Sequence, residues 1–250
     1  MRIEIDIHCY YYQKRLCWML SSILQQQGDI PDLVIDISHT ENDGKPTTSD
    51  VCRFFSLKGL NIRETIVSDE EVPNRAIARN RQVARACQDR DSDWLLFSDS
   101  DMVYDSMFFC DLAEKIQGKE NGSKLLSADR VSLKRHICLD YFEKDESSYP
   151  CEIKNVAHMV SSWKVFYVGG GEKAAGYFQL ASLQMLTDIC GNKYSNDNKD
   201  NFSKCITDRK FRHLFEGLEQ IDTLPQYHIN HNRERWHKNQ GEVGCGREQR

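Results

Sequence analysis

The chain has 250 residues, of which 40% are hydrophobic, and its formal net charge of -5 gives an isoelectric point near 5.9. This composition suffices for one large domain with an apolar core, and it excludes the broad basic face that nucleic-acid binding needs. The longest apolar runs, at 33–37 and 94–97, are far shorter than the roughly 20 residues that span a bilayer. The N-terminus has no signal-peptide pattern, so we expect a cytoplasmic protein with no transmembrane segment and no nucleic-acid partner.

The chain contains ten cysteines, and none of them is paired as Cys-x-x-Cys. Several fall at apolar positions of expected helices or strands, which favours reduced thiols that pack as small hydrophobic side chains. A structural zinc site assembled from cysteines distant in the sequence is the alternative. The ten residues are Cys9, Cys17, Cys52, Cys87, Cys110, Cys138, Cys151, Cys190, Cys205 and Cys245.

Strand and helix patterns alternate through the first hundred residues. Gly28 and Pro31 stop the first helix, and Pro73 opens the helix that precedes the most apolar strand. Such alternation predicts an α/β fold with a single mixed, mostly parallel sheet flanked by helices. In chain order we expect a strand at 3–9, a helix at 13–27, a strand at 33–37, a helix around 50–57, a strand at 62–67, a helix at 73–89 and a strand that ends at Asp99.

The pattern is looser beyond Asp101. The Asn- and Asp-rich stretch 192–201 and the acidic stretch 140–155 are typical of loops, and the last ten residues, 241–250, are expected to be frayed. The remaining expected elements are a helix at 105–117, a strand at 124–128, a strand at 165–168, and helices at 180–190 and 202–215.

Two carboxylates end the most apolar strand. Asp99 and Asp101 follow the run 94–97, with Ser100 between them. Because strand residues alternate faces, both carboxylates point the same way, at the edge where α/β sheets bind ligands. Two like charges this close are most stable beside a hard divalent cation, which would bridge to the phosphates of a substrate. A solvated loop that caps a helix is the alternative interpretation.

Four segments follow one another in a characteristic order: the helix end Ser21–Gln26, the strand Asp32–Asp36, the triplet Ala78-Arg79-Asn80 and the run Leu95–Asp101 into Asp-x-Asp. Together they resemble the family-2 glycosyltransferases, which have the GT-A fold. The resemblance covers about the first 105 residues. In agreement with the charge argument, Asp101 is the first choice for a direct metal ligand, and Asp99 for a second ligand or for binding the hydroxyls of the sugar or ribose. Ser100 is expected to contact the nucleotide sugar.

The resemblance implies a single GT-A domain over residues 1–250. Residues 1–105 would bind a nucleotide sugar, 106–240 would bind the acceptor, and 241–250 would form a flexible tail. The expected activity is transfer of a hexose from a nucleoside diphosphate, most often UDP, to a hydroxyl group, for example of a glycan. The departing diphosphate gains negative charge, and a divalent cation would stabilise it.

The nucleotide would bind at the ends of the first two strands. By the same resemblance, His8, Tyr10 and Tyr11 lie where the base binds, and one aromatic ring would stack on uracil. Asp36 would lie beside the base or ribose. Arg79 would donate to phosphate or ribose, or would instead form a structural ion pair with one of the two carboxylates. Packing in the core is the alternative for at least one tyrosine.

The C-terminal region offers two histidines three residues apart. The segment 227–233 resembles the metal-binding stretch of the β-1,4-galactosyltransferases, in which a Met or His and then a His complete the coordination. By that likeness His228 and His231 join Asp101, with His231 ranked first, and imidazole ligands favour Mn²⁺ over Mg²⁺. Arg233 would close over the diphosphate. The alternative is a solvated basic tail.

An inverting transferase needs a carboxylate that takes the proton from the acceptor hydroxyl. The family usually supplies it from a Glu-Asp pair ahead of a late helix, and the counterpart here is Asp208, which lacks the Glu. Glu172 is the second candidate, because it follows three glycines that let the backbone approach a ligand. A simple role at a helix N-terminus is the alternative for Asp208. A reaction that retains configuration needs no such base.

Two other functions fit the Asp-x-Asp motif. A haloacid-dehalogenase-type phosphohydrolase also carries it after a buried strand, but Met102 and Val103 replace the usual threonine, and about a hundred residues of α/β pattern precede it. A non-catalytic module that binds a nucleotide sugar is the third possibility. Turnover of a UDP-sugar would separate the three.

Overall fold

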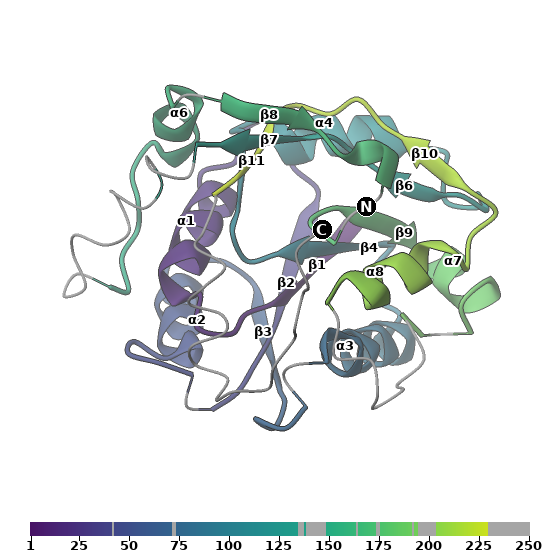
Figure 1. The fold of residues 1–250 in the computed structure, drawn as a ribbon, viewed down its shortest axis with the longest axis horizontal. Helices are drawn as coiled ribbons and strands as arrows, with labels where there is room; N and C mark the ends of the chain where they lie inside the picture. The colour runs from purple at the N-terminus through teal and green to yellow at the C-terminus, as the bar shows by residue number, and fades with distance from the viewer. Residues whose placement is uncertain are drawn as a thin grey trace, which may run out of the picture.

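The structure is a computed structural model. It describes residues 1–229 apart from 42, 72–73, 135–137, 139–148, 164, 174–175, 192 and 195–203. In the described part, one sheet of seven strands and one of four strands are surrounded by helices (Figure 1). None of the described helices is long and apolar enough to cross a membrane.

The larger sheet is mixed and mostly parallel. Its strands are β1 (Arg2–His8), β2 (Asp32–His39), β3 (Ile62–Ile66), β4 (Trp94–Asp99), β6 (Leu125–Ser127), β9 (Gln179–Ser182) and β10 (Leu218–Gln220). They follow the order β10-β6-β9-β4-β1-β2-β3. Strands β1 to β4 run parallel to one another, whereas β9 runs antiparallel to both β4 and β6. This arrangement confirms the expected α/β architecture.

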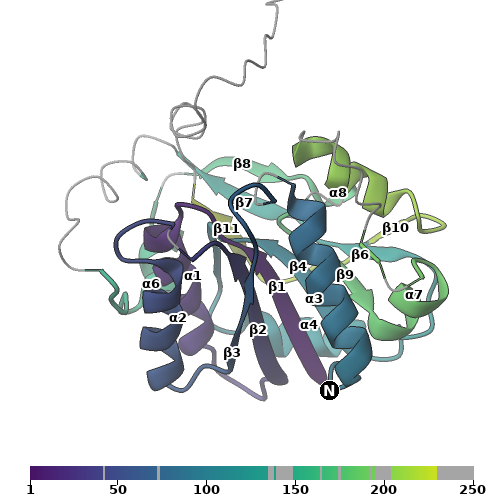
Figure 2. The same ribbon diagram turned by 90° about the horizontal axis from the view of Figure 1, so that it is seen from below.

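Helices cover both faces of this sheet. They are α1 (Gln13–Leu24), α2 (Thr48–Leu57), α3 (Arg75–Asp89), α4 (Phe108–Ile116), α6 (Val156–Ser161), α7 (Leu183–Asp188), α8 (Lys204–Arg212) and the single 3₁₀ turn η1 (Gly171–Lys173). In Figure 1, α1 and α2 lie on one side of strands β1 to β3, and α3 lies on the other side. Figure 2 shows α6 beside α1, and α7 and α8 on the side of α3.

A second sheet brings the end of the described chain back to its middle. Its strands are β5 (Met102–Tyr104), β7 (Arg130–Leu133), β8 (Val165–Gly169) and β11 (Gln226–His228), in the order β5-β11-β7-β8. β5 follows β4 after a turn of two residues, and β11 pairs antiparallel with it. The histidine-bearing segment therefore lies directly beside the Asp-x-Asp turn.

Local sequence explains where α2 and α3 begin. Thr47 accepts a hydrogen bond from the Asp50 amide, and the Asp50 carboxylate accepts one from the Thr47 amide, which makes a capping box at α2. Asn74 caps α3 by accepting from the Ala76 amide. Helix α3 thus starts two residues later than the expected opening at Pro73.

The serine-and-glutamine end of α1 fixes the segment that follows the Asp-x-Asp turn. Ser22 Oγ accepts a hydrogen bond from the Tyr104 amide at 3.1 Å. The Gln26 side chain donates to the Asp105 carbonyl at 2.7 Å and accepts from the Phe109 amide at 3.0 Å. These bonds hold β5 and the start of α4 against α1, so this part of the motif positions the strand that pairs with β11.

Both faces of β1 are buried, but they differ in chemistry. Ile3, Ile5 and Ile7 are fully buried in the main apolar core with α1 and α2. Glu4 and Asp6, which point to the opposite face, are also fully buried. Burial raises the pKa of the Glu4 carboxyl and raises that of Asp6 well above its usual range. An acidic layer therefore lies inside the protein on this face of the sheet.

The helix expected at 180–190 is wrong in its first part. Residues Gln179–Ser182 form β9, and only Leu183–Asp188 are helical. A short apolar run does not separate a buried strand from a buried helix by its periodicity. Pairing with β4 decides the outcome, since β9 fills the position next to it in the sheet. The sequence also gave no expectation for β5, β7, β10 or β11, which have three or four residues each.

Candidate functional site

The expected site lies at the carboxyl edge of the parallel strands. His8 at the end of β1 is in register with Asp99 at the end of β4 on one side, and with Ser38 of β2 on the other. His8 is buried, and its Nδ1 lies 3.1 Å from Ser38 Oγ. The edge at which α/β sheets bind ligands thus carries an imidazole between a hydroxyl and a carboxylate.

Asp99 is held by an arginine that the sequence analysis did not single out. Arg75, the first residue of α3, donates from Nη2 to Asp99 Oδ1 at 2.8 Å. Burial alone raises the pKa of the Asp99 carboxyl, but attraction to Arg75, with smaller contributions from Arg79 and His228, outweighs it. The net pKa lies below the usual value, so Asp99 is ionised at neutral pH.

Asp101 meets a histidine from the other end of the chain. His228 Nε2 lies 3.3 Å from Asp101 Oδ2, and both side chains are nearly buried. The Ile229 amide also donates to the Asp101 carbonyl at 2.9 Å. Two ligands of one octahedral ion, each at about 2.1 Å, lie about 3 Å apart. A carboxylate and an imidazole at this separation therefore fit a shared divalent cation such as Mn²⁺.

Arg79 takes part in a different cluster from the one expected. Its guanidinium is fully buried and donates to Asp208 Oδ1 at 2.9 Å, to the Gly176 carbonyl at 3.1 Å and to the Tyr194 hydroxyl. The neighbouring Asn80 accepts from the Tyr194 amide at 2.7 Å. The Ala-Arg-Asn triplet thus anchors two later segments to α3, and the arginine pairs with Asp208 where Asp99 or Asp101 was expected.

Asp208 connects this cluster to the carboxylate edge. Its Oδ2 lies 3.5 Å from Arg75, the arginine that binds Asp99. Charges therefore alternate in a row from Asp99 through Arg75 and Asp208 to Arg79. Gly176 packs so tightly against the Asp208 carboxylate that any Cβ there would collide with it. The Asp208 side chain keeps 17% of its surface exposed, so it is not fully enclosed by protein.

Two tyrosines follow β1 at the same edge. Their rings meet edge to face with centroids 4.5 Å apart. Tyr10 is partly buried against Val67 and Ala78, whereas Tyr11 is 45% exposed and has a φ of 59°. A left-handed backbone is unusual for a residue with a large side chain, and such strain is found at ligand-binding positions. Tyr11 is the exposed aromatic ring available for stacking.

Two other expected residues have different surroundings. Asp36 lies within β2, fully buried, where it accepts from Thr65 Oγ1 at 2.9 Å and pairs with Arg85. It therefore belongs to the acidic layer under α3 and is enclosed by protein. Glu172 lies in η1, is exposed, and accepts from the Gly170 amide at 3.0 Å. Both roles stay predictions.

Ser100 lies in the turn between β4 and β5 and is buried. His231 and Arg233 lie outside the described residues, so their expected roles at the metal and the diphosphate stay predictions. Within the described residues, the site gained Arg75 and Tyr194, which sequence reasoning missed. Arg75 had one available signal, since it directly follows a capping asparagine at the start of the helix that carries the triplet.

No family model and no curated protein matches the chain, but solved structures do. S. aureus TarS 1–349 in complex with UDP has a TM-score of 0.59 at 13% identity, over 91% of this chain and 60% of that chain. The same protein with UDP-GlcNAc gives 0.55 at 13% identity, over 93% and 59%. The mannosyltransferase PcManGT from Pyrobaculum calidifontis, with GDP-Man and Mn²⁺, gives 0.52 at 13% identity, over 93% and 58%.

The chain spans about 60% of the length of these structures, and the low identity means that the likeness concerns the fold. Family-2 membership stays a prediction. The likeness extends over more than 90% of this chain, well beyond the 105 residues that carried the sequence resemblance. With its mixed sheet flanked by helices and its carboxylate-bearing β4 near the centre, the chain has the GT-A fold of the glycosyltransferases.

Proposed function

We propose that the protein is a metal-dependent glycosyltransferase that moves a sugar from a nucleoside diphosphate, UDP in the first instance, to a hydroxyl acceptor. The single observation that carries the proposal is the approach of His228 to Asp101 at 3.3 Å. A carboxylate at the end of β4 and an imidazole from β11 meet at the edge where this fold binds its ligands. The GT-A fold supports the reaction class.

Different residues at the carboxyl edge bind different parts of the nucleotide-sugar donor. Tyr11 stacks on the base, and His8 with Ser38 lies below it at the ends of β1 and β2. Arg75 lies beside Asp99 and donates to a phosphate oxygen, since a guanidinium binds such oxygens well. Ser100 holds a hydroxyl of the sugar or ribose.

Asp99, Asp101 and His228 hold the cation, and His231 is the further ligand that we propose. The mixed oxygen and nitrogen set favours Mn²⁺ over Mg²⁺. When bound, the ion supplies positive charge that stabilises the departing diphosphate. Asp99 is ionised and accepts a hydrogen bond from Arg75 with one of its oxygens. It therefore does not have to lose a proton before a cation binds at neutral pH.

We propose an inverting reaction in which Asp208 takes the proton from the acceptor hydroxyl. Its Oδ1 accepts a hydrogen bond from Arg79, while Oδ2 packs against Gly176 and has a longer contact of 3.5 Å with Arg75. The second oxygen can therefore receive a proton as the hydroxyl attacks the anomeric carbon. Glu172 is the competing candidate, and the variants Asp208→Asn and Glu172→Gln distinguish them. Replacing the true base should lower kcat and remove the ionisation of that base from the pH profile of the reaction. The other variant should keep the kcat and the pH profile of the wild type.

Thermal stability with UDP and Mn²⁺ tests the proposal, followed by a scan of UDP-sugars for release of UDP. We expect UDP to stabilise the protein only when Mn²⁺ is present, and one donor to be hydrolysed slowly without acceptor. A stability shift without turnover of any donor would instead indicate a non-catalytic nucleotide-sugar module. Release of phosphate from a simple ester, lost in Asp99→Asn, would indicate a phosphohydrolase; the GT-A fold argues against that outcome.

A further inference from the structure

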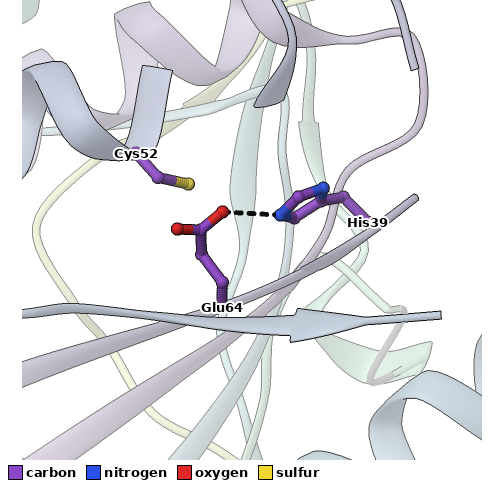
Figure 3. Close-up of side chains that lie close together, drawn as sticks. All are labelled: His39, Cys52 and Glu64. Carbon is purple, nitrogen blue, oxygen red and sulfur yellow. Dashed lines mark hydrogen bonds and ion pairs between the residues drawn. The ribbon is translucent and has the colours of Figure 1, made fainter. Parts of the chain in front are cut away.

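A second group of possible metal ligands lies outside the carboxylate edge. His39 ends β2, Cys52 lies in the second turn of α2, and Glu64 lies in β3. One ligand atom of each residue lies within 4.8 Å of the others, and Figure 3 shows the sulfur, the imidazole and the carboxylate pointing toward one another. Three segments of the sequence thus bring three different ligand types to one point.

The hydrogen bonds of His39 indicate which of its two ring nitrogens carries a hydrogen. Nδ1 lies 2.7 Å from the Thr40 carbonyl, and a carbonyl only accepts, so Nδ1 carries a hydrogen. Nε2 then faces Glu64 Oε2 at 2.9 Å. In a neutral ring this nitrogen is an acceptor that faces the oxygen of an acid, so a proton or a metal ion must lie between them. The proton would be on the ring or on the carboxyl group.

Cys52 favours the metal ion. Its thiol is 1% exposed, and neither a protonated ring nor an ion pair requires sulfur beside it. Thiolate, imidazole and carboxylate are the ligands of zinc-class ions, and a histidine that donates its other N–H to a carbonyl is the usual arrangement of such a ligand. Two ligands of a tetrahedral ion at about 2.0–2.1 Å lie about 3.3 Å apart, so the Nε2 to Oε2 distance needs to open by only a few tenths of an ångström.

We propose that His39, Cys52 and Glu64 bind a zinc-class ion that ties α2 to the end of β2 and to the middle of β3. The fourth position is open to water, as in sites with three protein ligands. The Glu64 side chain is 35% exposed, which gives the ion a route from solvent, whereas the other two ligands are enclosed. The ion is distinct from the one at Asp101, where the ligands are oxygen and nitrogen.

Binding requires the Cys52 thiol to lose its proton. Burial raises the pKa of this thiol, and the Glu64 charge raises it further, so the metal-free residue is a neutral thiol at pH 7. The metal must therefore displace a proton, and its affinity rises with pH.

Cobalt provides a direct test, because a thiolate bound to Co²⁺ gives a sulfur-to-metal charge-transfer band in the near ultraviolet. The full chain is first stripped with a chelator and then given one equivalent of Co²⁺. We expect this band in the wild type, its removal by Zn²⁺, and its persistence in excess Mn²⁺ or Mg²⁺. The carboxylate edge contributes no sulfur at Asp99, Asp101 or His228, so cobalt bound there cannot produce the band.

Three variants complete the test. Cys52→Ser should remove the band, and His39→Asn should weaken Co²⁺ binding by at least about tenfold. Cys110→Ser is the matched control, because it removes a half-buried thiol from α4, which contributes nothing to the cluster. Circular dichroism checks that each variant is folded.

No sulfur band in the wild type, or a band that survives in folded Cys52→Ser, overturns the proposal. The protonated His39 paired with Glu64 would then be the correct interpretation. The transferase proposal is tested by UDP-dependent stabilisation and turnover, so either proposal can fail while the other stands.

Discussion

Two acidic residues on the parallel strands have pKa values that are shifted in opposite directions. Asp99 at the carboxyl edge has a lowered pKa, because Arg75 and its neighbours outweigh the effect of burial. Asp6 in the middle of β1 has a pKa raised well above the usual range, because burial outweighs the more distant Arg79 and Arg85. Position along the strand thus decides whether the surroundings favour the charged or the neutral form of the carboxyl group.

The difference between the pKa shifts of Asp99 and Asp6 follows from the groups that each carboxylate contacts. Asp99 has a direct ion pair at 2.8 Å and keeps 22% of its side chain exposed. Both oxygens of Asp6 are buried without a hydrogen bond among the described residues, and Glu4 adds a repulsive charge nearby. Burial of a carboxyl group without a close cation favours its protonated form. The same residue type therefore has a lowered pKa in one place and a raised pKa in the other.

The largest expected effect comes from Asp101→Asn, which removes the charge from the proposed metal ligand. We expect kcat/KM for UDP-sugar turnover to fall about a thousandfold, or about 4 kcal/mol, because metal stabilisation of the diphosphate is worth several kcal/mol. Stabilisation by UDP with Mn²⁺ should disappear as well. Asp93→Asn is the control, since Asp93 is exposed at the other end of the strand segment. Normal turnover in Asp101→Asn would contradict the proposed site.

Arg75→Gln is expected to have the next largest effect. Loss of the guanidinium should lower kcat/KM about a hundredfold, or about 2.7 kcal/mol, since charge-assisted hydrogen bonds to phosphate and to Asp99 are lost. The pKa of Asp99 should rise, so the acid limb of the pH profile should move to higher pH. Arg75→Lys should restore part of the activity and of the shift. An unchanged acid limb would show that Arg75 does not set the charge of Asp99.

Asp6→Asn tests whether the pKa of the buried Asp6 carboxyl group is raised. The folded-state pKa of Asp6 is raised, so its contribution to stability is greatest below the unfolded pKa of about 4 and is lost as pH rises toward the folded pKa. The free energy of unfolding of the wild type should therefore fall relative to Asp6→Asn by up to about 1.4 kcal/mol per pH unit above pH 4. Urea unfolding at several pH values measures this difference.

Asp50→Asn is a control for which the pH dependence of the free energy of unfolding has the opposite sign. The Thr47 backbone and side chain lower the pKa of Asp50, so its contribution is present above the unfolded pKa and is lost as pH falls. If the stability of the wild type relative to Asp6→Asn does not change between pH 5 and 8, Asp6 is ionised in the folded protein and the prediction fails.

The smallest expected effect is that of Tyr11→Ala. Loss of one stacked ring should raise KM for the donor about fivefold, or about 1 kcal/mol, with little change in kcat. Stability should not decrease, because Tyr11 is exposed and its positive φ is unfavourable for a large side chain. Tyr11→Phe should keep the wild-type KM. A loss of kcat in Tyr11→Ala would indicate that the ring does more than bind the base.

Particular elements show how far sequence reasoning reached. The alternation of strands and helices up to Asp99 was readable, because each element carries its own apolar periodicity and stop signals. The strand β9 was taken for part of a helix, since four buried residues have no distinctive period. His231 was ranked ahead of His228, yet the histidine that the described structure brings to Asp101 is His228. The pairing of β11 with β5 is what brings His228 to the carboxylate, and the ranking of His231 stays a prediction.

The sequence by itself determined the α/β alternation and the position of two carboxylates at the end of a buried strand. Both are local properties, set by side-chain periodicity within one element. The tertiary structure alone decided that Arg75 pairs with Asp99, that His228 reaches Asp101, and that the pKa of Asp6 is raised. Charge state and ligand partners depend on groups brought from distant segments, and the spacing of residues along the chain does not encode those contacts.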